Sequence, residues 1–199
     1  MPTVVTEAPY RPVPLDAPRK RWTREDCALL DSVGAFEKLE LVEGELINKM
    51  SKRPPHQITL GLAIEWLMQI FGTRFVRSET PIDVRPEDNP SSQPEPDVIV
   101  LRRDFTEFRT GNPQPEDIRL LVEVSDSTLG FDLTTKASLY ARAGIVEYWV
   151  MDVATQRIVV HRAPEGGLYS QITVYGDSEF VAPLAAPDKA LTVRAAFPS

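Results

Sequence analysis

Hydrophobic and polar positions along this chain follow the periods of a mixed α/β protein. Residues 57–71 carry apolar side chains at helical spacing, and residues 132–143 predict a second helix that ends at Gly144. Short apolar runs typical of buried strands occupy residues 74–84, 98–101, 118–125 and 147–153, with weaker strand patterns at 157–162, 169–175 and 179–182. The order helix, three strands, helix, strand predicts an α/β fold with a mixed central sheet flanked by helices.

The N-terminal part adds an arm, a short helix and an acidic β-hairpin. Five prolines fall within residues 1–21, so this stretch is expected to be an extended arm. Thr23 is placed to cap a helix over residues 24–33. Residues 39–47 alternate as two strands and predict a hairpin that turns at Glu43 and Gly44. No linker pattern follows, and residues 22–199 are therefore expected to form a single domain.

Composition and charge limit the classes of function. The chain has 199 residues, 42% of them hydrophobic, and a net charge of -7, so no global positive charge favours nucleic acid. One cysteine and two histidines exclude an intramolecular disulfide framework and argue against a Cys/His zinc cage. No export signal and no apolar run of about 20 residues is present. We therefore expect a cytoplasmic protein that is not inserted into a membrane.

The carboxylate of Glu123 stands out because it lies inside an apolar strand, between Val122 and Val124. Removing an ionised carboxylate from water costs several kcal/mol or more unless a cation or hydrogen-bond donors compensate. The structural alternative is that Glu123 is a strand-edge acid paired with Arg119 or Arg142. The apolar neighbours of Glu123 on both sides argue against this alternative. The position indicates a metal, a lysine or a raised pKa nearby.

A second acid, Asp97, opens the preceding apolar strand, although an aspartate after Pro96 also suits a turn. Two acids on adjacent strands, with the Val124 carbonyl as a further donor, would suit Mg²⁺ or Mn²⁺, since Mg²⁺ prefers oxygen ligands and keeps several waters. Such an ion supports phosphodiester hydrolysis. Lys136, on the next helix, could reach the same place, but its spacing alone favours a surface ion pair with Asp132.

These residues resemble the PD-(D/E)XK nucleases, whose restriction-endonuclease-like core has the order αβββαβ and carries Pro-Asp on one strand and Glu-x-Lys on the next. Pro96-Asp97 matches the first half, while Ser125 stands where the lysine is usual. The string from Leu121 through Lys136 to Asp152, together with the acidic hairpin and His56, is similar to the Uma-two family of bacterial endonucleases. The resemblance covers about residues 22–174.

The resemblance implies roles for individual residues. Asp97 and Glu123 would be metal ligands, Lys136 the catalytic lysine in a migrated position, and Glu40 a further acid that reaches the metal or a bound water. It implies a metal-dependent endonuclease acting on DNA. The alternative is a catalytically inactive nuclease-fold protein that binds nucleic acid or a protein partner.

A local basic cluster is the candidate surface for phosphate. We expect substrate contacts from Lys52, Arg53, His56 and Arg77. The alternative, that these residues are an ordinary solvated surface, explains the cluster equally well. Because phosphate contacts dominate nucleic-acid affinity, an acidic protein with so small a patch should bind DNA weakly. Nucleases that cut both strands are often two-fold dimers, and a homodimer is expected on that ground.

Overall fold

The computed structural model describes residues 20–35, 39–48 and 53–198, so the predicted arm over residues 1–21 lies almost entirely outside the described residues. Helix α1 (Arg24–Ser32) begins after Thr23, as its sequence predicts. The Thr23 hydroxyl accepts from the Asp26 backbone N–H at 3.2 Å, and the Asp26 carboxylate accepts from the Thr23 N–H at 3.0 Å. This reciprocal capping satisfies two backbone donors that a helix start otherwise leaves unpaired.

The acidic hairpin forms a separate two-stranded sheet of β1 (Leu39–Val42) and β2 (Glu45–Asn48). Glu43 and Gly44 both have positive φ, 49° and 77°, as a two-residue turn of type I′ requires. The predicted turn is therefore confirmed. Leu41 bridges to Gln93, and the Gly44 N–H donates to the Ser91 carbonyl at 2.7 Å, so the hairpin is anchored to the loop that precedes β4.

The central sheet has six strands in the order β3-β4-β5-β6-β7-β8. Strands β5 and β6 run parallel, whereas every other neighbouring pair is antiparallel, which confirms the predicted mixed sheet. The strands are β3 (Val76–Ser78), β4 (Val98–Leu101), β5 (Ile118–Ser125), β6 (Glu147–Asp152), β7 (Arg157–Glu165) and β8 (Leu168–Tyr175).

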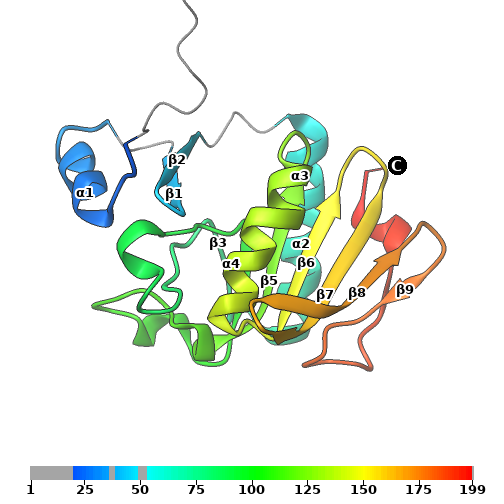
Figure 1. Ribbon diagram of the computed structural model, residues 1–199. Helices are drawn as coiled ribbons and strands as arrows, with labels where there is room; N and C mark the ends of the chain where they lie inside the picture. Colours follow the sequence, from blue (N-terminus) through cyan, green and yellow to red (C-terminus); the bar gives the residue numbers. More distant parts are fainter. Residues whose placement is uncertain (1–19, 36–38, 49–52, 199) are drawn as a thin grey trace, which may run out of the picture.

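Helices cover both faces of this sheet (Figure 1). Helix α2 (Pro54–Phe71) packs on one face, and its Ala63 and Leu67 join a core with Val98, Val122 and Trp149. The other face carries a continuous helical segment made of α3 (Leu129–Phe131), the π-helical turn η4 (Asp132–Lys136) and α4 (Ala137–Ala143). This segment is the crossover between β5 and β6, as parallel neighbours require. The order α2, β3, β4, β5, α4, β6 is the predicted one.

The structure corrects several boundaries. The strand expected over residues 74–84 is only β3, because Glu79 has a positive φ of 47° and Pro81 follows, which removes a donor and restricts Thr80. The crossover helix starts three residues earlier than predicted and contains the π turn, which the periodicity did not show. It does end at Gly144, which is left-handed with φ 79°.

The remaining elements are short. Strand β9 (Phe180–Val181) lies within the predicted residues 179–182 and pairs with the unpredicted β10 (Leu191–Thr192). Single 3₁₀ turns are η1 (Asn89–Ser91), η2 (Phe105–Glu107), η3 (Pro115–Asp117) and η5 (Val193–Ala196). Among the described helices, none combines the length and the apolar character needed to span a membrane.

Candidate active site

Two carboxylates oppose each other where β4 enters the sheet beside the end of β5. Val98 pairs with Val122 and Ile99 with Leu121, so the same register places Asp97 opposite Glu123. The Asp97 N–H donates to Glu123 Oε2 at 3.3 Å, and the Val124 N–H donates to Asp97 Oδ2 at 2.9 Å. Like charges directly opposite one another on neighbouring strands destabilise a sheet unless something compensates. This position therefore calls for a cation.

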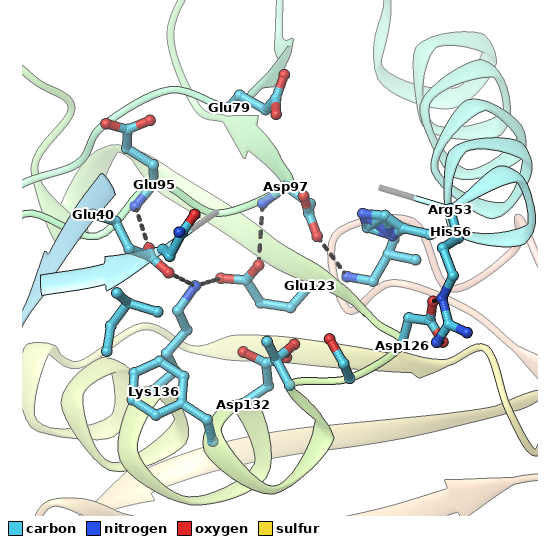
Figure 2. Close-up of a pocket in the computed structure, with 16 residues that line it drawn as sticks. Glu40, Arg53, His56, Glu79, Glu95, Asp97, Glu123, Asp126, Asp132 and Lys136 are labelled. Carbon is cyan, nitrogen blue, oxygen red and sulfur yellow. Dashed lines mark hydrogen bonds and ion pairs between the residues drawn. The ribbon is translucent and has the colours of Figure 1, made fainter. Parts of the chain in front are cut away.

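Lys136 provides one cation. Its Nζ lies 2.9 Å from Glu123 Oε1 and 2.9 Å from Glu40 Oε1, and its side chain is only 5% exposed (Figure 2). Glu123 shares its strand face with Leu121, which packs against α4, so strand alternation turns its carboxylate towards the helix that carries Lys136. The surface pair with Asp132, the alternative that spacing allowed, is replaced by two buried pairs with glutamates.

Glu40 comes from β1 and is also buried. Besides its ion pair with Lys136, it accepts a hydrogen bond from the Glu95 N–H at 3.2 Å. The hairpin thus contributes one acid to the site, as expected. Glu45 is exposed, and Glu43 pairs with Arg142 at 2.6 Å outside the site, as surface acids do.

Sequence reasoning missed Asp132 as a site residue and left Tyr140 open between the site and the core. Asp132 is buried, and its Oδ2 accepts from the hydroxyls of Ser125 and Thr128, each at 2.6 Å. The Tyr140 hydroxyl donates to Glu123 Oε1 at 3.0 Å. Helical spacing places Tyr140 one turn after Lys136, a signal that could have assigned it to the site; no comparable signal pointed to Asp132.

Burial and the surplus of acids set the protonation of the site. Burial raises the pKa of Glu123 to about 8; the Lys136 charge lowers it, and Asp97, Asp132 and Glu40 raise it. Burial alone would lower the pKa of Lys136, but Glu123 and Glu40 hold it well above its usual range. Burial also raises the pKa of Asp132. Lys136 therefore stays charged, while the carboxylates repel one another.

These groups form one wall of a cavity of about 300 Å³. Among the described residues, its lining contains seven carboxylates but only two permanently charged cations, Lys136 and Arg53. Both Arg53 and His56, two of the expected substrate contacts, line it from the start of α2 (Figure 2). Arg53 makes a two-pronged ion pair with Asp126, at 2.6 and 2.7 Å. The pocket is acidic at its base and carries one exposed guanidinium at its rim.

The remaining expected substrate contacts are Lys52 and Arg77. Lys52 lies outside the described residues, and Arg77 does not line the cavity because its guanidinium stacks 4.7 Å above the ring of Phe105. Two further arginines pair with acids, Arg74 with Asp104 and Arg103 with Asp117. Exposed ion pairs of this kind also occur on an ordinary solvated surface, so the phosphate contacts stay a prediction.

The donors suit a hard divalent cation that keeps part of its water. In the described part of the chain, no three His, Cys, Asp or Glu side chains are placed to hold a metal by themselves. Mg²⁺ needs fewer protein ligands, commonly one or two carboxylates, with waters and substrate oxygens completing the shell. The N–H and C=O of a strand residue face the same neighbour, so the Val124 carbonyl faces the side of Asp97. Asp97, Glu123 and this carbonyl therefore fit such an ion.

A solved structure has a fold similar to that of this chain. A crystal structure described as "a putative nuclease belonging to DUF820", from Anabaena variabilis ATCC 29413, superposes with a TM-score of 0.59 and 14% sequence identity. The similarity covers 79% of this chain and 88% of that one. No curated protein matches the chain significantly.

A family model gives the stronger relationship. The Uma2 model, described as "Putative restriction endonuclease", matches residues 25–194. This range includes the hairpin, both carboxylate strands and the crossover helix, and it agrees with the resemblance seen in the motifs around Asp97, Glu123 and Lys136. Since the match extends over most of the sequence, the chain belongs to the Uma2 family.

Proposed function

We propose that this protein is a metal-dependent endonuclease that hydrolyses phosphodiester bonds of DNA, with Mg²⁺ or Mn²⁺ as cofactor. The observation that carries the proposal is the opposition of Asp97 and Glu123 beside the buried Lys136, at the base of a cavity. Two acids and a lysine at one sheet edge supply the charges that phosphodiester hydrolysis needs. Family membership supports nuclease chemistry in general.

Asp97, Glu123 and the Val124 carbonyl would hold the ion. When bound, a divalent ion activates water and stabilises charge on the phosphoryl oxygens. Tyr140 and Lys136 both bind Glu123 Oε1, which fixes the carboxylate and leaves Oε2 on the side of Asp97. The protein thereby orients its carboxylate before any ligand arrives, so little reorganisation accompanies the reaction.

Lys136 acts in this proposal as a fixed positive charge. Two glutamates hold its pKa above the usual range, so its ammonium group keeps its proton and is a poor general base. A charged Nζ can donate to the attacking water or to a phosphoryl oxygen and stabilise negative charge as it develops. Lys136 is therefore not the general base in this proposal.

Arg53 is the proposed phosphate contact at the rim. Its side chain is 67% exposed and already presents its guanidinium fork to the carboxylate of Asp126. The same fork geometry binds a phosphate through two hydrogen bonds. Because an exposed ion pair contributes little stability, exchanging Asp126 for a phosphate costs little.

A cleavage assay on linear and supercoiled DNA tests the proposal. Activity should require Mg²⁺ or Mn²⁺, disappear with a chelator, and fall by about 100-fold or more in Glu123→Gln, as loss of a group that stabilises the transition state does. Glu65→Gln, an exposed change on α2, is the matched control and should cleave like the wild type. Equal cleavage by Glu123→Gln and the wild type would refute the assignment.

One observation favours a binding protein without catalysis. The Glu123 carboxylate already accepts from Lys136, Tyr140 and the Asp97 N–H in a buried network, as it would in a purely structural role. Calorimetric titration with Mn²⁺ separates the two functions. A nuclease should bind the ion and lose that binding in Asp97→Ala, whereas a non-catalytic protein should release no heat with Mn²⁺ and still retain DNA.

A further inference from the structure

Strand β8 ends the central sheet on the side away from β3 and β4 (Figure 1). Among the described residues, no strand pairs with its outer edge, because β8 pairs only with β7. The strand is eight residues long, and six of its residues are exposed. Its sequence, Leu-Tyr-Ser-Gln-Ile-Thr-Val-Tyr, contains no charged residue and no proline. A long regular edge of this kind leaves backbone donors and acceptors open to another strand.

Apolar side chains accompany the open backbone. Ile172 is 59% exposed and Val174 is 51% exposed. They pair across the strands with His161 and Val159, so both lie on the same face of the sheet, as residues two apart on a strand do. Proteins usually protect an edge strand with charges, proline or a covering segment. None of these protects β8 within the described chain, which indicates that the edge has a partner.

We propose that two copies of this chain pair through β8, antiparallel about a two-fold axis at Thr173. In this register Ile172 of each copy lies opposite Val174 of the other, and Thr173 lies opposite itself. The apolar row formed by Val159 and Val174 therefore continues into the second copy. A two-fold interface must complement itself, and this strand does so without placing any like charges opposite each other.

The pairing leaves the candidate active site open. The pocket lies at β4 and β5, whereas β8 is three strands beyond β5. Continuing the sheet through both copies separates the two β5 strands by seven strand spacings, about 34 Å at about 4.8 Å each. Each copy thus keeps a complete, accessible pocket. Loss of the dimer and loss of nuclease activity are therefore separate experimental outcomes.

Light scattering on the full chain tests the dimer. The wild type should have about twice the chain mass of 22.3 kDa, and the double variant Ile172→Lys with Val174→Lys should have the single mass. The matched control is Leu29→Lys with Val33→Lys, two exposed apolar positions around α1, which should remain dimeric. Unchanged circular dichroism would show that the β8 variant is folded. A monomeric wild type at all concentrations, or a dimeric β8 variant, would overturn the proposal.

Cysteine cross-linking tests the register. Directly opposed strand residues have Cα atoms about 4.5–5.5 Å apart, within the range of a disulfide, so Thr173→Cys should cross-link under mild oxidation. Ser170→Cys is the control, because this register displaces the two copies of residue 170 by six residues, about 20 Å. The chain's own Cys27 is buried and should not react. Equal cross-linking of both variants, or of neither, would reject the axis at Thr173.

Discussion

Replacing Lys136 by methionine should destabilise the fold in a pH-dependent manner. Methionine keeps the approximate length of the side chain and removes its charge. Lys136 pairs at 2.9 Å with both Glu123 and Glu40, and all three side chains are at most 7% exposed. Without the lysine, two buried carboxylates would face Asp132 and Asp97 with no buried cation between them.

The magnitude follows from the burial of the pair. Removing one partner of a buried ion pair costs about 3–5 kcal/mol, because the remaining charge stays out of water. For a chain of this size each kcal/mol lowers the melting temperature by about 2–4 °C, so a loss of about 6–20 °C is expected. Lys189→Met is the control. That lysine is 58% exposed and pairs with the exposed Asp188, so its loss should change stability by less than about 0.5 kcal/mol.

The pH dependence tests the electrostatic reasoning. In the wild type the pKa of Glu123 is raised to about 8, so the folded state binds more protons than the unfolded state between about pH 4.5 and 8. Stability from this group is complete below about pH 4.5 and is lost as the pH rises through about 8. Removing Lys136 raises this pKa further, so both folded proteins keep the Glu123 proton up to about pH 7 and differ only above it. In denaturant titrations the deficit of the variant should therefore stay level from pH 5 to pH 7 and widen as the pH rises through about 8. A deficit below about 0.5 kcal/mol at pH 8, or one independent of pH, would refute the reasoning.

Three further variants test neighbouring groups. Tyr140→Phe removes the hydroxyl bonded to Glu123 and should cost about 1–2 kcal/mol in chemical denaturation, with lower affinity for Mn²⁺ in calorimetry; unchanged values for both would contradict its positioning role. His161 is buried between Tyr148 and Tyr169, and burial lowers its pKa. The stability that it contributes is therefore present above about pH 6.5 and is lost as the pH falls through the lowered pKa. His161→Phe should remove this fall in the free energy of unfolding at acid pH, and an unchanged pH dependence would contradict the burial effect. Arg53→Gln should leave the melting temperature nearly unchanged but weaken DNA binding and reduce its salt slope by about 1, whereas an unaltered slope would exclude a phosphate contact.

Short-range signals predicted much of the fold. Residues close together in the sequence determine three of the correctly predicted features. These are the turn at Glu43 and Gly44, the helix cap at Thr23 and the helix end at Gly144. The apolar runs of β4, β5 and β6 identified buried strands, because few other environments tolerate them. Glu123 was predicted to need a partner for the same reason. A carboxylate among apolar neighbours requires compensation wherever the chain brings it.

Tertiary placement limited the rest of the prediction. The residues 74–84 carry a strand pattern, but the positive φ of Glu79 ends the strand early. Lys136 could be assigned to the site only through family resemblance, because spacing alone favoured a surface pair with Asp132. Asp132 itself enters the site through the π turn, which shifts side chains relative to a regular helix and leaves no signature in the periodicity. The partners of the arginines could not be predicted from the sequence, because the acids that pair with Arg53 and Arg74 lie 73 and 30 residues away along the chain.

The most direct test of the proposed nuclease site is a crystal structure soaked in Mn²⁺, with the metal located by its anomalous scattering. The proposal predicts a peak at coordination distance from a carboxylate oxygen of Asp97 and of Glu123, on the side of the Val124 carbonyl, with Lys136 still bound to Glu123. The absence of a peak there, or a peak only at other carboxylates of the pocket such as Glu79 or Asp126, would contradict the proposed metal-dependent site.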